Sequence, residues 1–392
     1  MTSTMPDLTT YPISDAAAAS LRRPLFGHVI DGEIVPSLDG ATMPVLDPAS
    51  GQQVATAAAG TEADVERAVR SARAAFDDGR WRDVPPLEKE RRLRRLSSLL
   101  AERGDEFAEI DVIDAGLLRM YTGFIVQFAV DGIDYYAGWP SKLTGSIPPV
   151  PSEFAVYQVR EPIGVVGLIS PWNGPTAVFA MIVAALSCGN SVVLKPAEQT
   201  PMAAVGMAEL ALEAGIPSGV FNVVQGVGET VGAALVAHPA VDAISFTGSV
   251  DTGRAIQANA AARVKRVSLE LGGKSPFIVF DDADLEGATA AAMMGVWGAS
   301  GQVCTCGTRL LVQRDIHDEL VDTIVESSRG MRLGSGFDPE TQMGPLVSAD
   351  QLAATSFVGE IGNLGAASVG VALAMGLDTA GPGDHVLALA YG

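Results

Sequence analysis

From residue 161 to residue 246, short apolar segments alternate with segments that favour helices, and this alternation constrains the fold more than any other feature. Strands separated by helices form β-α-β units, whose strands lie parallel in one sheet with helices on both faces. The expected strands are residues 164–169, 191–194, 219–224 and 243–246. The expected helices follow Pro175 and cover residues 203–214 and 231–238. The sequence therefore predicts an α/β fold around a mostly parallel sheet.

The chain of 392 residues is long enough for two or three domains, so further elements are expected outside this sheet. It is 48% hydrophobic and 18% charged, as in a globular protein with a large core. A second sheet is predicted from residues 276–280 and 308–313, with helices over 285–294 and 316–327. Before the main sheet, the sequence predicts a flexible arm over 1–25, a hairpin over 28–34 and helices over 62–77 and 87–113.

The charge and cysteine content exclude several classes of partner. The net charge of −20 argues against nucleic acid or an anionic membrane as the main partner, and the Arg-rich side of residues 87–113 is expected to be a solvated helix face. Three cysteines do not suggest a disulfide-rich secreted protein. The first twenty residues do not resemble a signal peptide, and the longest apolar run, 177–188, is too short for a transmembrane helix. We expect a cytoplasmic protein.

Three residues carry groups that together can add a nucleophile to an aldehyde. Cys304 offers a thiol, Glu270 a carboxylate before Gly272-Gly273, and Asn173 an amide in the run Pro171-Trp172-Asn173-Gly174-Pro175. A thiolate can attack the carbonyl carbon, an amide can stabilise the oxyanion, and a carboxylate can move protons. Taken singly, each residue has an ordinary structural interpretation as a buried thiol, a turn residue or a cap. A metal site at Cys304 and Cys306 would lack a second Cys or His cluster.

A glycine-rich segment, Gly226-Val227-Gly228-Glu229-Thr230-Val231-Gly232, follows a predicted strand and opens a predicted helix. Dinucleotide-binding proteins place such glycines where the backbone approaches a pyrophosphate. This segment has one residue more between its last glycines than that fingerprint allows. By itself it is weak evidence for a nucleotide site.

In order and spacing, these motifs make the chain similar to the NAD(P)-dependent aldehyde dehydrogenase superfamily over about residues 28–352. The resemblance implies that Cys304 is the nucleophile of a thiohemiacetal and then a thioester, that Glu270 is the general base, and that Asn173 stabilises the oxyanion with the backbone N–H of Cys304. It implies a Rossmann-like parallel sheet that binds NAD and a truncated α/β catalytic domain. The expected division is 26–142 and 161–271 for NAD binding, 143–160 for oligomerisation strands and 272–352 for the partial catalytic domain.

The resemblance also assigns cofactor contacts. Lys195 and Glu198 match residues that hold the adenosine ribose, and Ser249 matches a phosphate contact. A carboxylate near the ribose 2′-hydroxyl would repel a 2′-phosphate, so Glu198 favours NAD over NADP. The other implied cofactor-binding residues are Ile169, Trp172, Gly228, Phe246, Gly248 and Leu271. No metal is expected, and the substrate is expected to be a small aldehyde.

The sequence departs from the family in two places. The helix after Pro175 lacks the usual Lys and is one residue short, which affects the expected placement of Asn173. The likeness stops shortly after Val347, at about residue 352, without the family's Glu-x-Phe-Gly-Pro motif and its last strand. Any homo-oligomer is therefore expected to be weakened. Residues 353–392 instead resemble the C-terminal end of a thiolase-superfamily ketoacyl or hydroxymethylglutaryl-CoA synthase. The alternatives are therefore an inactive remnant that keeps NAD binding and an acyl-CoA-handling hybrid.

Overall fold

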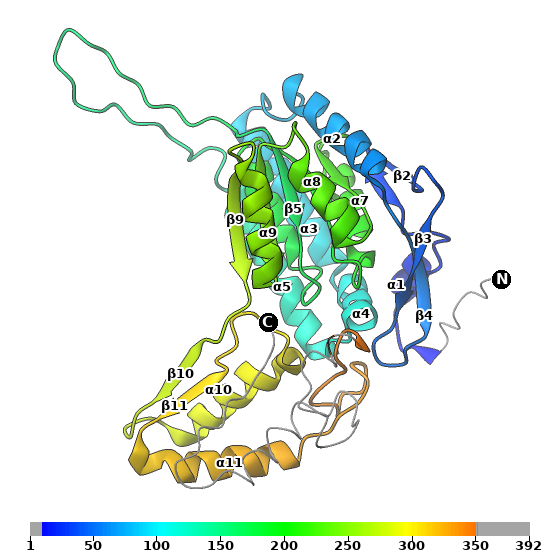
Figure 1. Cartoon of the computed structure of the whole chain (residues 1–392), viewed down its shortest axis with the longest axis vertical. Helices are drawn as coiled ribbons and strands as arrows, with labels where there is room; N and C mark the ends of the chain where they lie inside the picture. The colour runs from blue at the N-terminus through cyan, green and yellow to red at the C-terminus, as the bar shows by residue number, and fades with distance from the viewer. Residues whose placement is uncertain (1–9, 350, 352–392) are drawn as a thin grey trace.

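A seven-stranded sheet forms the centre of the larger part of the molecule (Figure 1). The structure, a computed structural model, describes residues 10–349 and 351. The strand order is β2-β1-β7-β6-β5-β8-β9, and the strands from β5 to β9 are parallel to one another. The bounds are β1 His28–Ile30, β2 Glu33–Val35, β5 Val165–Ile169, β6 Ser191–Lys195, β7 Phe221–Val223, β8 Ala243–Gly248 and β9 Arg266–Leu271. The predicted α/β fold with a Rossmann-like sheet is confirmed.

The chain reverses its direction of progress across the sheet at β5. Strands β6 and β7 are added on one side of β5, whereas β8 and β9 are added on the other. Adjacent parallel strands that connect in opposite directions leave a crevice at their carboxyl ends, where α/β proteins bind ligands. The boundary between β5 and β8 is therefore the expected place for a ligand.

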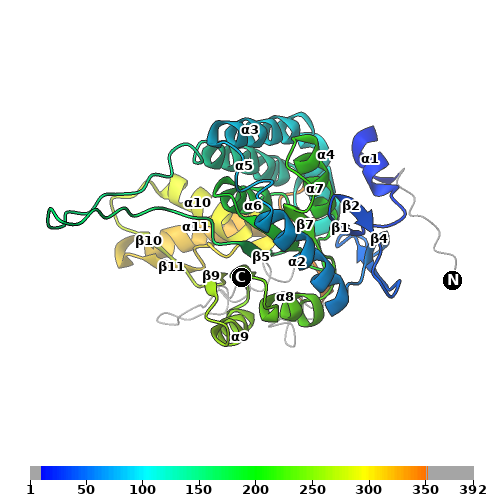
Figure 2. The same ribbon diagram turned by 90° about the horizontal axis from the view of Figure 1, so that it is seen from above.

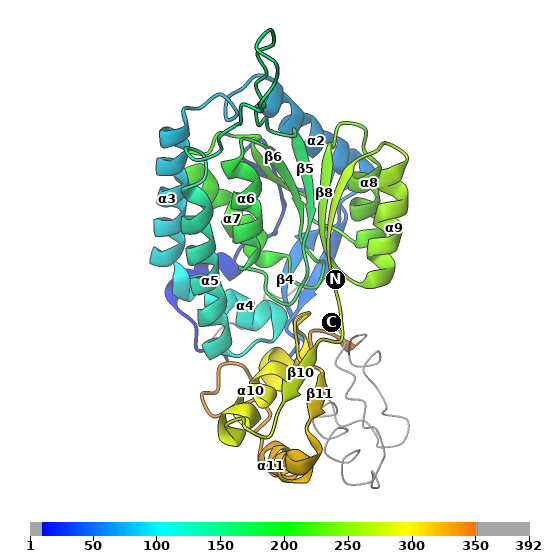
Figure 3. The same cartoon turned by 90° about the vertical axis from the view of Figure 1, so that its left-hand side faces the viewer.

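Helices cover both faces of the sheet, as Figure 2 and Figure 3 show. On one face, α2, α8 and α9 share a core with Val165, Ile169 and Val193. On the other, α3 to α7 share a core with Leu168, Val192 and Leu194. Successive residues such as Leu168 and Ile169 contribute to opposite faces, because side chains alternate between the two sides of a β-sheet along each strand. The bounds are α2 Glu62–Asp77, α3 Pro86–Glu102, α4 Gly104–Ala115, α5 Arg119–Ala137, α6 Val178–Ser187, α7 Met202–Glu213, α8 Ala233–Ala237 and α9 Val250–Ala261.

The N-terminal region differs from the expected flexible arm over residues 1–25. Helix α1, Asp15–Leu21, packs on α4, and Leu21 is 1% exposed. The Ser20 hydroxyl donates a 2.6 Å hydrogen bond to Glu106 on α4. The prediction of a flexible arm is wrong for residues 10–25. Ala17, Ala18 and Leu21 form an apolar helix face, and burial of that face stabilises α1. Residues 1–9 lie outside the described part.

The structure also corrects the long helix expected over residues 87–113. It is two helices, α3 and α4, separated at Arg103, whose φ of −105° and ψ of 19° are not helical. Gly104 follows and has a low helix propensity. The Arg103 guanidinium then pairs with Glu106 at 2.7 Å, at the start of α4. The hairpin was predicted correctly, with Asp31 and Gly32 both at positive φ, as a two-residue turn requires.

A smaller unit hangs below the main sheet in Figure 1. Its strands β10, Pro276–Val279, and β11, Arg309–Val312, pair in parallel. Helices α10, Leu285–Trp297, and α11, His317–Arg329, pack on one face of that pair around a core that includes Trp297 and Leu320. The sequence predicted these four elements. On the other face, the apolar side chains of Ile278, Phe280 and Leu311 are exposed.

Two further segments complete the described chain. Strands β3, Thr42–Leu46, and β4, Gln53–Ala58, form a separate antiparallel pair that the sequence analysis did not predict. Residues 143–160 protrude as a long excursion (Figure 1) whose two arms are joined by one bridge, between Ser146 and Gln158. This is less than the pair of strands expected there. No helix among the described residues is long and apolar enough to cross a membrane.

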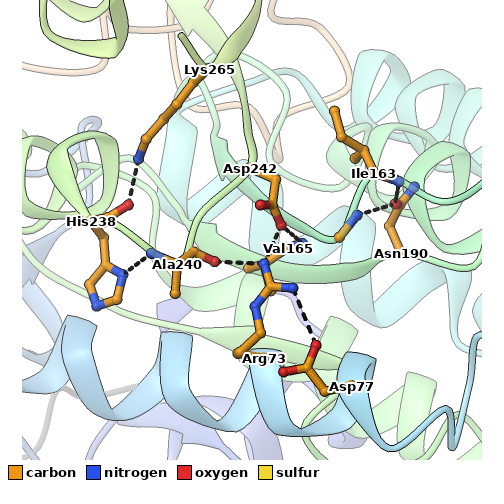
Figure 4. Close-up of polar contacts among 10 residues, drawn as sticks. Arg73, Asp77, Ile163, Val165, Asn190, His238, Ala240, Asp242 and Lys265 are labelled. Carbon is orange, nitrogen blue, oxygen red and sulfur yellow. Dashed lines mark hydrogen bonds and ion pairs between the residues drawn. The ribbon is translucent and has the colours of Figure 1, made fainter. Parts of the chain in front are cut away.

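Polar contacts close the edge of the sheet where β5 and β8 begin (Figure 4). The Asp242 carboxylate pairs with Arg73 of α2 and accepts a 2.8 Å hydrogen bond from the backbone N–H of Val165. Asn190 accepts from the backbone N–H of Ile163 at 2.8 Å. Lys265 donates to the carbonyl oxygen of His238 at 2.5 Å. These contacts stabilise the amino ends of the strands. A ligand is therefore expected at the opposite, carboxyl ends.

Candidate active site

The residues predicted to bind the cofactor gather at the carboxyl ends of the central strands. Ile169, at the end of β5, pairs with Lys195 of β6 on one side and with Phe246 of β8 on the other. A Cβ atom on Gly232 would lie 3.9 Å from the Ile169 side chain, so the turn that begins at Gly228 reaches the same place. Gly248 pairs with Leu271 in the next strand. The structure thus places most of the predicted cofactor residues at the carboxyl ends of β5, β6, β8 and β9.

Lys195 and Glu198 form an ion pair, with 2.5 Å between Nζ and Oε2. The Lys195 side chain is 3% exposed and the Glu198 side chain 32% exposed. A buried ammonium needs such a partner, because desolvation disfavours an unpaired charge. The pair therefore holds the Glu198 carboxylate in a defined position at the surface end of β6.

The remaining predicted cofactor residues lie in the turns beside these strands. Gly228 opens a short π-helical turn, Gly228–Gly232, and a Cβ atom placed on it would meet no heavy atom within 4 Å. Ser249 caps α9, since its hydroxyl accepts a 3.1 Å hydrogen bond from the backbone N–H of Thr252. A Cβ atom on Gly248 would lie 2.5 Å from the Phe246 ring. The backbone at Gly228 is open to a ligand, whereas Gly248 is needed for packing. Trp172 is partly exposed in the turn after β5.

The loop that carries Cys304 has a strained backbone. Ala299, Ser300 and Gly301 adopt φ values of 50°, 58° and 76°, three left-handed residues in succession. Non-glycine residues at such angles occur where the surrounding structure imposes them, often at functional sites. Here the Ser300 hydroxyl donates a 2.9 Å hydrogen bond to the carbonyl oxygen of Gly344. The loop is therefore held by a segment more than forty residues later in the chain.

Gln302 joins this loop to both of its neighbours. Its backbone carbonyl oxygen accepts a 2.6 Å hydrogen bond from Nδ2 of Asn173. Its side-chain oxygen accepts a 3.0 Å hydrogen bond from the backbone N–H of Val347. Gln302 is 2% exposed. Asn173 and the Cys304 loop are thus in direct contact, although the helix after Pro175 lacks the family's Lys. Sequence analysis did not identify Gln302 as important, and its place in the Cys304 run was the only signal.

The two neighbouring thiols differ in environment. Cys304 is half-buried and Cys306 is buried. Burial raises the pKa of the Cys306 thiol, and the nearby Cys304 raises it further. Since the thiolate is the nucleophile, Cys306 is the poorer candidate. The assignment of Cys304 as the nucleophile stays a prediction.

Glu270 lies on β9 with its side chain exposed. Among the described residues, its carboxylate makes no hydrogen bond to Cys304 or Asn173. The turn after β9 does reach the loop that carries Cys304, since a Cβ atom on Gly273 would lie 4.0 Å from the Cys304 carbonyl oxygen. The structure therefore brings Glu270 to the edge of the site without a direct contact. The role of Glu270 as the general base stays a prediction.

Tyr121 of α5 is a site neighbour that the sequence analysis missed, because no helix was predicted there. It packs against Ala299 and Val303 of the loop that carries Cys304. Burial raises the pKa of its hydroxyl, and Cys306 and Cys304 nearby add to the shift. The phenol is therefore neutral at ordinary pH. No group of three or more Cys, His, Asp or Glu residues in the described part could hold a metal ion.

Comparisons with known proteins agree with this arrangement. The sequence model of the aldehyde dehydrogenase family matches residues 34–369. The chain is 44% identical over 319 residues to aldehyde dehydrogenase 1 of Tanacetum cinerariifolium, covering 81% of this chain and 64% of that protein. It is 42% identical over 333 residues to betaine aldehyde dehydrogenase of Cereibacter sphaeroides (strain ATCC 17025 / ATH 2.4.3), covering 84% and 68%. The chain thus spans about two thirds of the length of these relatives.

A solved structure, the NAD⁺ complex of an aldehyde dehydrogenase from Bacillus cereus, superimposes with a TM-score of 0.86 and 38% identity. It covers 88% of this chain, and this chain covers 70% of it. The family match ends at residue 369, beyond the limit of 352 expected from the sequence. Residues 353–392 lie outside the described part. The family match contradicts the expected thiolase-like tail over 353–369, and for 370–392 that assignment stays a prediction.

Proposed function

Because the chain belongs to the aldehyde dehydrogenase family, we propose that it oxidises a small aldehyde to a carboxylic acid with NAD as the electron acceptor. The observation that carries the proposal is the contact between Asn173 and the Cys304 loop, at 2.6 Å from Nδ2 to the Gln302 carbonyl oxygen. This contact supports the proposal because it joins the loop that carries an amide donor to the loop that carries a half-buried thiol.

The chemistry assigned to the chain's own residues follows from these positions. The Cys304 thiolate adds to the aldehyde carbon, and Asn173 and the Cys304 backbone N–H stabilise the oxyanion. NAD, when bound, accepts the hydride that leaves this thiohemiacetal. A water molecule then hydrolyses the Cys304 thioester, and Glu270 removes the proton of that water. Aldehyde, NAD⁺ and water thereby give carboxylate, NADH and two protons, and the Cys304 thiolate is released.

The crevice residues support NAD as the cofactor. The Lys195–Glu198 pair presents a carboxylate at the end of β6, which suits the hydroxyls of a ribose. Gly228 leaves the backbone open, as a close approach by a pyrophosphate requires. A relative of known structure binds NAD⁺. The proposed contacts are Ile169, Trp172, Lys195, Glu198, Gly228, Phe246, Gly248, Ser249 and Leu271.

The excursion of residues 143–160 is proposed to mediate self-association. Its exposed apolar side chains include Ile147, Phe154, Tyr157 and Val159. Exposed apolar segments of this kind are typical of association surfaces. The cytoplasmic location stays a prediction from the sequence.

NADH formation from a panel of simple aldehydes tests the proposed reaction. We expect turnover that depends on both aldehyde and NAD and that disappears in Cys304→Ala, while NADH still binds to that variant. Binding of NADH without turnover in the unmodified chain would instead favour a remnant that only binds the cofactor. A product that requires coenzyme A would favour the acyl-CoA-handling alternative.

A further inference from the structure

Two fully buried carboxyl groups lie one turn apart on α4. Asp111 and Asp114 are both 0% exposed. The Asp111 carboxyl accepts hydrogen bonds from the backbone N–H of Thr176 at 3.2 Å and from its hydroxyl at 3.0 Å. The Asp114 carboxyl accepts from the backbone N–H of Met202 at 2.9 Å. Asp111 therefore contacts the backbone where the chain enters α6, and Asp114 contacts it where the chain enters α7.

Those two segments are the loops that carry the proposed site. Thr176 lies three residues after Asn173 and leads into α6. Met202 is the first residue of α7 and lies four residues after Glu198. The unpaired N–H groups at a helix start need acceptors, and here one helix supplies acceptors for two others. Helix α4 thus sets the far ends of both active-site loops.

The two loops also pack against each other. Ser170 and Pro171 of the first loop and Pro196 and Thr200 of the second line one small hollow. On its other side, the second loop is held by Gln225, whose Nε2 donates a 3.0 Å hydrogen bond to the Pro201 carbonyl oxygen. Asn173 is held by Gln302 and Glu198 by Lys195, whereas the ends of both loops that enter α6 and α7 are held by the carboxyls of α4.

Burying two neighbouring carboxyl groups costs folding free energy. This cost distinguishes Asp111 and Asp114 from exposed helix-capping residues. Burial raises the pKa of Asp111 to about 7. Burial also raises the pKa of Asp114 well above its usual range, and the nearby Asp111 adds to that shift. One oxygen of Asp114 has no hydrogen-bond partner among the described residues. Polar groups buried at such a cost are expected where they have a specific structural task.

We propose that Asp111 and Asp114 are positioning residues, Asp111 for the oxyanion donor Asn173 and Asp114 for the ribose-binding Glu198. This inference rests on the proposed function of the site. It assigns the two carboxyls separable effects, because they hold different loops. Loss of the Asp111 anchor should impair the reaction of Cys304 with a carbonyl compound. Loss of the Asp114 anchor should impair cofactor binding.

Two measurements on the full chain separate these effects. NADH binding is followed by fluorescence titration. Acylation of Cys304 is followed by p-nitrophenol release from p-nitrophenyl acetate, a reaction that needs the thiol and the oxyanion donor and no cofactor. The unmodified chain and Cys304→Ala are measured first. If the unmodified chain neither binds NADH nor is acylated, the proposed function fails, and the positioning inference fails with it.

The variants are Asp111→Ala and Asp114→Ala, with Glu106→Ala as the matched control. Glu106 is a buried carboxylate on the same helix that contacts Ser20 and Arg103, away from both loops. For Asp111→Ala we expect p-nitrophenol release to slow about tenfold to a hundredfold, since misplacing a catalytic group by about 1 Å has effects of that order. For Asp114→Ala we expect the NADH Kd to rise about tenfold, which corresponds to about 1.4 kcal/mol. Each variant should leave the other measurement within about twofold.

Substitution by Asn keeps an acceptor oxygen and should restore most of both properties. If an alanine variant does not fold, the corresponding serine variant, Asp111→Ser or Asp114→Ser, replaces it. Serine keeps a polar hydroxyl in the buried position but is too short to contact the backbone N–H of Thr176 or Met202. The inference is overturned if Asp111→Ala and Asp114→Ala lower thermal stability as Glu106→Ala does but leave p-nitrophenol release and the NADH Kd unchanged. It is also overturned if each variant affects both measurements equally.

Discussion

The side-chain amide of Asn173 donates a 2.6 Å hydrogen bond to the backbone carbonyl oxygen of Gln302, two residues before Cys304. This bond joins the loop after β5 to the loop that precedes β11. An amide nitrogen carries two hydrogens. One of them is directed at Gln302, and the planar amide thereby fixes the direction of the second. The contact orients the donor that the proposed reaction needs.

Replacing Asn173 by Asp should therefore affect both the oxyanion donor and the loop contact. A carboxylate has no hydrogen to donate and would face the Gln302 carbonyl oxygen with a like partial charge. Removal of one oxyanion donor typically lowers kcat by about 10²–10³. We expect a loss of at least that size in NADH formation, with NADH binding little changed. The control is Asn259→Asp on the exposed face of α9, and equal activity losses in the two variants would contradict the assignment.

Cys304 should be modified faster than Cys306 by a thiol reagent. Cys306 is 5% exposed and its thiol pKa is raised by burial, so little of it is thiolate at neutral pH. Iodoacetamide labelling followed by peptide mass spectrometry measures each site. Cys304→Ala should abolish turnover, whereas Cys306→Ala should keep most of it. Faster labelling of Cys306, or loss of activity only in Cys306→Ala, would reverse the assignment.

Glu198 should set the preference for NAD over NADP. Its carboxylate is held by Lys195 and would repel a 2′-phosphate at the ribose. Glu198→Gln should narrow the ratio of the two dissociation constants by weakening NAD binding and relieving that repulsion. Titration with NADH and NADPH gives the ratio for each protein. Comparable affinities in the unmodified chain would contradict this role for Glu198.

The sequence predicted the parts of the site that depend on local patterns. The central strands were predicted from their apolar runs. Cys304, Asn173 and Glu270 were assigned from motifs that resemble the family, and their catalytic roles stay predictions. Contacts between distant segments left no such pattern. Gln302 is a polar residue whose importance arises from contacts with Asn173 and Val347, 129 and 45 residues away. Likewise, Asp111 and Asp114 appear in the sequence as ordinary polar residues of a helix, and only the fold reveals their burial.

Helix α9 ends in an unfavourable backbone conformation that a single substitution should relieve. Val264 has a φ of 55° and is 90% exposed. A β-branched residue in the left-handed region costs roughly 1–2 kcal/mol, and glycine is the usual residue at this position after a helix. Val264→Gly should therefore raise the free energy of unfolding by about 1 kcal/mol. Val264→Ala keeps the Cβ atom and should give a smaller gain. Urea denaturation measures both, and a destabilised Val264→Gly would refute the argument.

The burial of Asp111 should make stability depend on pH in a direction opposite to that of a paired carboxylate. Its pKa is about 7 in the folded chain, against about 3.9 for an unperturbed Asp in the unfolded chain. Between these values the folded chain binds more protons than the unfolded chain, so its contribution to stability falls as pH rises. The full difference of about three pKa units corresponds to on the order of 4 kcal/mol, most of it lost by pH 7.

Asp111→Asn removes this titration and keeps the acceptor oxygen. The stability of Asp111→Asn relative to the unmodified chain should therefore rise by about 2–3 kcal/mol from pH 5 to pH 8. Glu106→Gln is the control: burial alone would raise the pKa of Glu106, but hydrogen bonds from Arg103 and Ser20 lower it overall. Its titration lies below pH 5, so its relative stability should stay constant over this range. Urea denaturation at both pH values measures the two differences, and a constant difference for Asp111→Asn would show that Asp111 is already ionised at pH 5 in the folded chain.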